Sequence, residues 1–224
     1  MMVTVRQAMI PAVPSTPAQH GRYERVLAAA AAMLAAGGED MLQMKELAER
    51  AKVSLATLYR YFPSKDHVLL AIAYNRYENA LRRVSAEPPN GATVQERVTS
   101  HLLREFRAEQ RDQKLTATLT RVLTDTRRDY SPVVRQVVGL HLTVLEQVAV
   151  GGRPLSREQR RRLVIALEVF SAASRRWLAG VSSAAEARFE IRMGCYLLAA
   201  PGLFPDEEPR GESPASAGTT VRSE

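Results

Sequence analysis

The chain has 224 residues, of which 46% are apolar, so it can bury one sizeable core or two small ones and is not a disordered protein. Its formal net charge of +7 permits a polyanionic partner without requiring one. A single cysteine, Cys195, excludes an intramolecular disulfide framework, and no apolar run approaches the roughly 20 residues needed to span a bilayer. These features predict a cytoplasmic protein with no membrane partner, in which Cys195 is a small buried side chain.

The first predicted elements are a flexible arm and an alanine-rich helix. Residues 1–20 contain prolines and small polar residues without any helical or strand period, which predicts a flexible N-terminal arm. A helix is predicted from Arg22 to Ala36, where apolar residues recur at helical spacing, and Gly37-Gly38 ends it. This helix supplies a surface for the two short helices that follow, which cannot bury a core by themselves.

Residues 44–65 are predicted to form two short helices and the first turn of a third. The first helix has one apolar stripe at i, i+3, i+4 and i+7, formed by Met44, Leu47, Ala48 and Ala51. The break that follows is short enough for a tight helix–helix turn, and Ser54 is placed to cap the second helix. The pattern therefore predicts a helix-turn-helix.

In the second helix, Leu58 and Phe62 are four residues apart and are predicted to hold the helix against its neighbours. Pro63 ends the helix, and Ser64 is predicted to cap the next one. The opposite arc is left exposed and consists of Ala56, Thr57, Arg60 and Tyr61.

The run TLYRYFPSK at residues 57–65, preceded by Leu47-Ala48 and Val53-Ser54, resembles the DNA-binding signature of TetR-family transcription regulators. The resemblance covers about residues 22–84. Within the family, Gln43-Met44 and this run are most similar to the KstR-like group, which governs steroid and lipid catabolism. One departure is that Gln43 or Met44 stands where the family commonly has a Ser or Thr cap that contacts a phosphate.

The resemblance implies that the second helix enters the DNA major groove, where base edges differ in their donors and acceptors. Base edges or the groove floor would be met by Leu55, Ala56, Thr57 and Arg60. The phosphates would be met by Tyr59, Tyr61 and Lys65, with Met44 and Arg22 as further contact residues. Arg60 could pair with a guanine. The alternatives are plain solvation for Arg60 and Lys65, and packing on the neighbouring helix for Tyr61.

The rest of the chain is predicted to be helical, with one long helix from Ser64 to about Val84 and a loop at residues 85–93. Further helices are expected at about 94–110, 115–128, 132–150, 156–180 and 183–200. No alternating, β-rich segment appears, so the fold class is all-α with about nine helices. The expected organisation is an arm (1–20), a three-helix DNA-binding domain (21–68), a C-terminal ligand-binding and dimerisation domain (69–200) and a disordered tail (201–224).

The last two predicted helices are apolar on one face, which fits either an intrachain core or an interface with a second copy. In TetR-like proteins the last two helices form the dimer, and the resemblance favours this reading. A dimer would read double-stranded DNA as an inverted-repeat operator whose half-sites lie about 34–36 Å apart, or a multiple of that.

The resemblance also implies that a small hydrophobic effector binds in the C-terminal domain. The candidate lining residues are Phe106, Leu119, Leu123, Val137, Leu140, His141, Leu145, Phe170, Ser174 and Trp177; ordinary core packing is the alternative for each of them. Positive charge favours an anionic effector such as a fatty-acyl or steroid-acyl CoA thioester. The arginines that contribute this charge are Arg121, Arg127, Arg128, Arg175 and Arg176.

Two other classes of protein compete with the regulator. An enzyme is disfavoured because the four histidines, His20, His67, His101 and His141, lack metal-ligand spacing and no nucleophile motif or phosphate loop appears. No cofactor, metal or catalytic residue is therefore expected. A sequence-tolerant DNA-binding protein would need positive charge alone, and its affinity would vary little with sequence but fall steeply with salt. Activation instead of repression also remains open.

Overall fold

The computed structural model describes residues 14–124, 131–200 and 203–204, with only the backbone of Ser131. Over these residues it contains nine α-helices, two short 3-10 helices and no strand, which confirms the all-α prediction. In chain order they are α1 (Pro17–Gly37), η1 (Glu39–Met41), α2 (Met44–Arg50), α3 (Leu55–Tyr61), α4 (Lys65–Ala86), α5 (Val94–Arg111), α6 (Gln113–Leu123), α7 (Ser131–Val150), α8 (Arg157–Leu178), α9 (Ala184–Cys195) and η3 (Tyr196–Leu198). The predicted tail, apart from Leu203 and Phe204, and residues 1–13 of the predicted arm lie outside the described residues.

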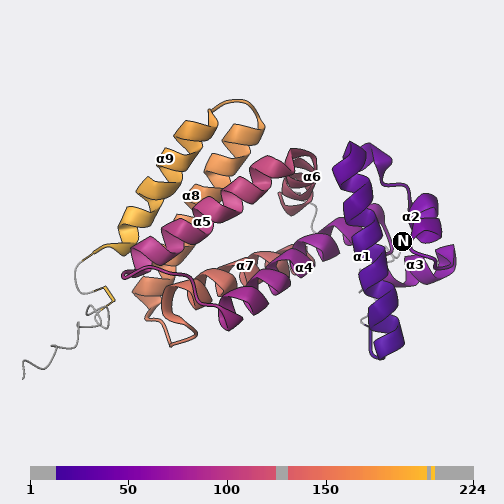
Figure 1. Ribbon diagram of the computed structural model, residues 1–224, viewed down its shortest axis with the longest axis horizontal. Coiled ribbons are helices and arrows are strands. Elements are labelled where there is room, and N and C mark those ends of the chain that lie inside the picture. Colours follow the sequence, from indigo (N-terminus) through magenta and orange to yellow (C-terminus); the bar gives the residue numbers. More distant parts are fainter. Residues whose placement is uncertain (1–13, 125–130, 201–202, 205–224) are drawn as a thin grey trace, which may run out of the picture.

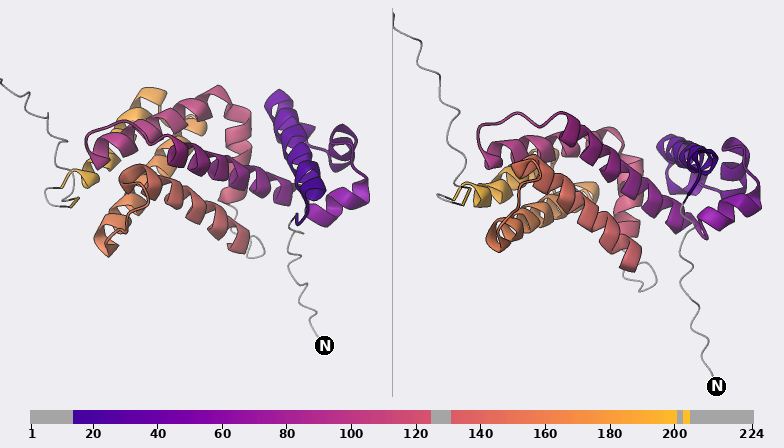
Figure 2. Two further views of the ribbon diagram at one scale, coloured as in Figure 1. Left: turned by 60° about the horizontal axis from the view of Figure 1, so that its bottom comes forward. Right: turned by 90° about the horizontal axis from the view of Figure 1, so that it is seen from below.

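The helices are arranged as a head and a body along one long axis (Figure 1). The head consists of α1, η1, α2 and α3, and the body consists of α5 to α9. Helix α4 runs from the head into the body, and α6 stands at the side of the body that faces the head (Figure 1). In the two turned views the head remains at one end of the molecule, away from α8 and α9 (Figure 2).

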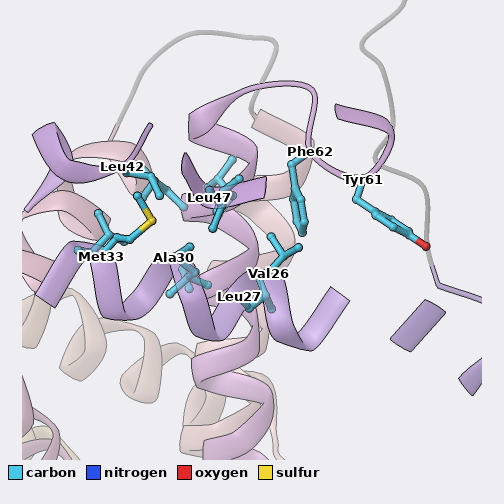
Figure 3. Packing of buried hydrophobic residues seen from close by; sticks show 14 of the residues in the cluster. Val26, Leu27, Ala30, Met33, Leu42, Leu47, Tyr61 and Phe62 are labelled. Atoms are coloured by element: carbon cyan, nitrogen blue, oxygen red, sulfur yellow. The ribbon is translucent and has the colours of Figure 1, made fainter. Parts of the chain in front are cut away.

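The head has an apolar core, in which side chains of α1 meet those of α2 and the segment after α3 (Figure 3). Met33, Leu47 and Phe62 are completely buried there. The same cluster continues into Leu119 of α6 and Val137 of α7. The core therefore crosses the predicted domain boundary at residues 68 and 69, because α4 is one uninterrupted helix and α6 packs against the head.

A second apolar cluster fills the body and includes Val98, Phe106, Leu145, Phe170 and Ile191. These residues come from α5, α7, α8 and α9. Cys195 is also buried in this cluster, as its sequence pattern predicts.

Most helix starts agree with the predicted caps. The Ser54 hydroxyl accepts a hydrogen bond from the Thr57 amide, and Ser156 forms a capping box with Gln159. At the start of α4, by contrast, Ser64 makes no capping bond, because its hydroxyl is hydrogen-bonded to Nδ1 of His67 at 2.8 Å.

Three helix boundaries differ from the sequence analysis, and one of them is the end of α6, which lies at Leu123 and not at about residue 128. Helix α1 begins at Pro17, inside the stretch that was predicted to be a flexible arm, because Thr16 and Gln19 form a capping box and proline suits the first helical position. The final helix, predicted to run to residue 200, ends at Cys195 and continues as the 3-10 turn η3.

One segment of α7, Pro132–Val150, is long and apolar enough to cross a membrane by length and composition alone. The sequence analysis did not expect such a run. Its residues Val137 and Leu145 are buried in the two apolar clusters, while His141 and Glu146 make ion-pair contacts with Glu105 and Arg160. These contacts are those of a core helix, for which an apolar face is the ordinary requirement.

Candidate nucleic-acid interface and effector site

Helix α3 is held from one side and leaves the other side free. Leu58 and Phe62 are completely buried in the head core, as their spacing predicts. On the opposite side Leu55 is 41% and Tyr59 43% exposed, although both are large apolar or aromatic residues. This side of α3 is therefore accessible to a partner, whereas the opposite side is held in the core.

Three further predicted contact residues lie on α3. Ala56 and Arg60 are exposed, and the guanidinium carbon of Arg60 lies 5.3 Å from the centre of the Tyr61 ring. This cation–π contact limits the positions that the guanidinium samples. Thr57 is half-buried, and its hydroxyl accepts a hydrogen bond from Ser54 at 2.8 Å. The hydroxyl of Thr57 is therefore engaged in the helix cap, whereas its methyl group is not.

The structure corrects the expectation for Tyr61. This residue is only 2% exposed, and its ring meets the Tyr23 ring edge to face with the centroids 6.0 Å apart. Figure 3 shows its side chain beside Phe62, with the hydroxyl directed away from the labelled core residues. Packing on the neighbouring helix, the alternative in the sequence analysis, describes Tyr61, and a phosphate contact does not fit its burial.

The other predicted DNA contacts are partly engaged within the head. The Lys65 ammonium donates to the Glu39 carbonyl oxygen at 2.9 Å, which uses one of its three donors. Met44 is half-buried against the head core, and Arg22 is half-buried on α1. At the start of α2 the predicted departure is present, because Gln43 makes no capping hydrogen bond.

Arg121 of α6 joins the body to the head. Its guanidinium donates to both carboxylate oxygens of Glu39, at 2.8 and 2.9 Å, and to the Asp66 carboxylate at 2.9 Å. This contact removes Arg121 from the arginines predicted to attract an anionic effector. Arg176 is likewise paired, with Glu190 of α9, and Arg175 is exposed. The remaining two, Arg127 and Arg128, lie outside the described residues.

The ten predicted effector residues do not form one lining. Leu119, Leu123 and Val137 belong to or pack against the head core, and Leu140 is half-buried on α7 outside both clusters. Phe106, Leu145, Phe170 and Trp177 belong to or pack against the body core. Within the second group, the Phe106 and Trp177 rings meet at a centroid distance of 5.1 Å, and those of His141 and Phe170 at 6.1 Å. The structure therefore brings together only the part of the set that lies in the body.

Beside these rings lies a buried polar cluster, which consists of Tyr77, His101, Glu105, Glu109, His141 and Ser174. Nε2 of His141 is 3.1 Å from the Glu105 carboxylate, and the Ser174 hydroxyl donates to the Glu109 carboxylate. The Tyr77 ring stacks on His141 with the centroids 4.0 Å apart. The cluster thus contains His141 and Ser174, two of the predicted effector residues.

Burial and neighbouring charges separate the pKa values of these groups. Burial raises the pKa of Glu109 to about 7, and the Glu105 charge adds to the shift. Burial also disfavours the charged form of Glu105, but His141 and its hydrogen bond outweigh it and lower the pKa of Glu105 to about 2. Burial lowers the pKa of His101 to about 4. At neutral pH, Glu105 is therefore charged, His101 is neutral and Glu109 is divided between its two forms.

The sequence analysis missed Tyr77, His101, Glu105 and Glu109 as parts of a site. A usable signal was present, because His101, Glu105 and Glu109 follow one another at intervals of four residues, on the same face of α5 as the buried Leu102. Acidic residues are rarely buried, so their presence on the apolar face of a helix indicates a candidate site. In the part of the chain that the structure describes, no group of three or more His, Cys, Asp or Glu residues could hold a metal ion.

The comparisons with known proteins identify the family and agree with the all-α fold. Residues 26–72 match the family model described as bacterial regulatory proteins, tetR family. A crystal structure of a TetR transcriptional regulator from Rhodococcus sp. RHA1 superposes with a TM-score of 0.73 and 25% identity, covering 82% of this chain and 98% of that one. The chain belongs to the TetR family of bacterial transcription regulators.

Within this family the chain is KstR-like. It is 32% identical to the HTH-type transcriptional repressor KstR of Rhodococcus jostii over 188 residues, which are 84% of this chain and 87% of that protein. A further similar structure is Thermus thermophilus FadR, a TetR-family repressor in complex with lauroyl-CoA. It has a TM-score of 0.62 and 19% identity and covers 88% of this chain and all of that one, a likeness that shows the fold alone.

Proposed function

We propose that this protein is a sequence-specific, effector-responsive repressor that binds an inverted-repeat operator as a dimer in the cytoplasm, without enzymatic activity. The observation that carries the proposal is the exposed side of α3, where Leu55, Tyr59 and Arg60 project from a helix that Leu58 and Phe62 anchor. Repression rather than activation follows the name of the KstR relative. In this proposal residues 21–68 bind DNA, and residues 69–200 bind the effector and dimerise.

On α3, base edges or the groove floor are assigned to Leu55, Ala56, Arg60 and the methyl group of Thr57. Tyr59 and the free donors of Lys65 are assigned to phosphates, with Met44 and Arg22 beside them. Tyr61 is left out because it is buried and instead supports Arg60 through the ring contact.

The DNA proposal is tested by an Arg60→Ala variant on duplexes from the upstream region of its own gene, beside a scrambled duplex, at about 150 mM salt. Loss of a bidentate contact to guanine costs about 1–3 kcal/mol, so operator affinity should fall by a factor between about 5 and about 150, while affinity for the scrambled duplex changes little. Arg82→Ala, which removes an exposed arginine of α4, is the matched control. Equal affinity of the wild type for both duplexes would instead indicate a sequence-tolerant DNA-binding protein.

The dimer is supported by exposed apolar residues on α8, α9 and η3, far from the head. Val164 and Ile165 of α8 are 38% and 42% exposed, and Phe189 of α9 is 65% exposed. Further exposed apolar residues in this region are Val181, Met193, Tyr196 and Leu197. A face of this kind needs a covering partner, and a second copy in a four-helix arrangement provides one.

The exposed face of α8 is also self-complementary in charge. Arg161, Val164, Ile165 and Glu168 are all exposed and follow one another at i, i+3, i+4 and i+7, so they share one face. If two copies of α8 cross antiparallel at Val164 and Ile165, each Arg161 lies beside the Glu168 of the other copy. A two-fold interface requires this kind of pairing of one surface with itself.

The dimer proposal is tested by charge reversal and the mass of the particle in solution. Arg161→Glu should weaken the dimer, because it places four carboxylates around the crossing point, and adding Glu168→Arg should restore it. Sedimentation at micromolar concentration distinguishes the two states. A wild-type monomer would contradict the dimer, whereas an unchanged dimer in the single variant would move the crossing point elsewhere.

Effector release is supported by the contact of α6 with both regions. Arg121 binds Glu39 of the head and Asp66 of α4, while Leu119 of the same helix packs in the head core. A shift of α6 on effector binding would therefore change its contacts with the head. Such a ligand switches the equilibrium only if it binds one of the two states more tightly than the other. The effector proposed here is small and hydrophobic, and an acyl-CoA thioester is one form that it could take.

A further inference from the structure

We propose that the buried polar cluster is the recognition end of the effector site, and that it selects an apolar molecule whose buried end carries a hydrogen-bond donor, a hydroxyl or an ammonium group. This inference rests on the proposed effector response and names the chemistry of its ligand. In this arrangement Glu105 accepts a hydrogen bond from the donor group of the effector. The buried polar end of the effector is therefore not an anion.

The cluster assembles groups from four helices in the interior of the body. Tyr77 comes from α4, Glu105 and Glu109 from α5, His141 from α7 and Ser174 from α8. A molecule that contacts these groups would therefore contact four helices at once. It would also contact α4, which runs on into the head (Figure 1).

One acceptor in the cluster makes no hydrogen bond of good geometry. The Oε2 atom of Glu105 is 3.1 Å from His141, but its Oε1 atom is buried without such a bond, and the Tyr77 hydroxyl is the neighbouring group that interacts with this carboxylate. A buried, unsatisfied carboxylate oxygen is costly, because its hydration is lost and nothing replaces it. A ligand that donates to Oε1 would remove this penalty on binding.

The same carboxylate is unusual as a structural device. The described residues place two histidines beside Glu105, His141 at 3.1 Å and the neutral His101 at 3.8 Å, and the positive charge of Arg76 also lowers the pKa of this carboxyl. Replacing buried ionic groups by well-packed apolar ones is often neutral or stabilising. Packing alone therefore does not account for a second buried carboxylate, Glu109, one turn away on the same helix.

The charge of the cluster decides between classes of ligand. Glu105 is ionised at neutral pH, so a carboxylate or phosphate beside it would meet like charge inside a medium of low dielectric. A hydroxyl or ammonium donor meets no such penalty. The adjacent Phe106, Phe170 and Trp177 rings supply apolar surface for the remainder of the molecule. An acyl-CoA effector could bind with its acyl chain in the body only if its phosphates stayed outside this cluster.

A series of probes with one alkyl chain and different polar ends tests the proposal: dodecylamine, 1-dodecanol, dodecanoate and lauroyl-CoA, each below its micelle concentration. Trp177 is the single tryptophan and lies beside Phe106, so its fluorescence reports binding at this place. The amine and the alcohol should bind at least about tenfold more tightly than dodecanoate. Dodecanoate binding as tightly as the donors would overturn the proposal, whereas lauroyl-CoA shows what an anionic group outside the cluster adds to binding.

The second measurement repeats the titration with Glu105→Gln, which keeps the shape but removes the charge and half of the accepting capacity. The preference for the donor probes should shrink to within about threefold. Glu87→Gln, which removes a carboxylate from the exposed end of α4, is the control and should keep the full preference. A full preference in Glu105→Gln would overturn the role of Glu105.

Operator binding without any probe separates the two proposals. Wild-type protein that binds its operator but shows no donor preference would contradict only the recognition chemistry. Protein that fails to distinguish operator from scrambled DNA would contradict the regulator itself. The wild-type preference series needs no variant, so it stays informative even if Glu105→Gln fails to fold.

Discussion

The head and the body are both built from packed helices, but their interiors are filled differently. Around Val26, Met33, Leu47 and Phe62 the head core is apolar. The body core contains apolar residues of similar size, such as Phe106 and Leu145, but it lies against a layer with two carboxylates and two histidines.

This difference suits two tasks, the rigid presentation of α3 by the head and the response of the body to a ligand or a proton. An apolar, close-packed core fixes one arrangement, which suits a head whose α3 must present its side chains rigidly. Buried ionisable groups lower the stability of the body but give it positions where a ligand or a proton changes the energy substantially. We therefore expect the head to respond mainly to changes of volume, and the body mainly to changes of charge.

The largest effect is expected from Phe62→Ala in the head. Phe62 is completely buried between α1 and α3, so its removal leaves a cavity and should lower the free energy of unfolding by about 3–5 kcal/mol. Tyr59→Ala on the same helix removes a ring that is 43% exposed and should cost far less. Urea unfolding of both variants measures the difference. Equal losses would mean that α3 is not anchored from the side that its buried residues define.

A smaller effect, which depends on pH, is expected from Glu109→Gln in the body. Burial raises the pKa of Glu109 from 4.5 to about 7, so the folded protein binds more protons than the unfolded chain between these values. The wild type should therefore lose about 3 kcal/mol of stability relative to the variant as the pH rises from about 4.5 to about 7. Urea unfolding of both proteins across this range gives the difference.

The variant is the necessary reference, because His101 acts in the opposite direction. Burial lowers its pKa from 6.5 to about 4, so its contribution to stability is lost as the pH falls through this range. The two slopes partly cancel in the wild type but not in the difference between the proteins. A stability difference independent of pH would show that Glu109 is not held in a raised-pKa environment.

The sequence allowed local structure to be predicted well where one residue decides it. Ser54, Ser156 and Gly37-Gly38 mark helix ends because capping is a property of a few neighbouring atoms. The anchoring of α3 by Leu58 and Phe62 could likewise be derived from helical spacing. The start of α1 was missed because residues 1–20 carry no helical period, although Thr16-Pro17 with Gln19 is itself a start signal.

The candidate sites were predicted less completely, because they depend on contacts between distant helices. Spacing alone left Tyr61 free to face DNA or the bundle, and only the position of Tyr23 on α1 shows that it faces the bundle. Similarly, the partnership of Glu105 with His141 joins α5 to α7, and nothing local specifies it. The ion pair of Arg121 with Glu39 likewise joins residues far apart in the sequence, so it could not be predicted from local spacing.

The smallest effect is expected at the junction of the two regions, from Arg121→Ala. Arg121 is 43% exposed but bridges Glu39 and Asp66, so its loss should lower stability by about 1 kcal/mol, near the upper end for exposed pairs. Arg82→Ala, which removes a single exposed pair with Glu78, is the control and should cost less. Because salt screens exposed charges, the excess loss in Arg121→Ala should vanish at about 1 M NaCl. A loss that persists there would mean that Arg121 joins head and body through the packing of its aliphatic stem, in which case the junction resembles the apolar head core more than the charged interior of the body.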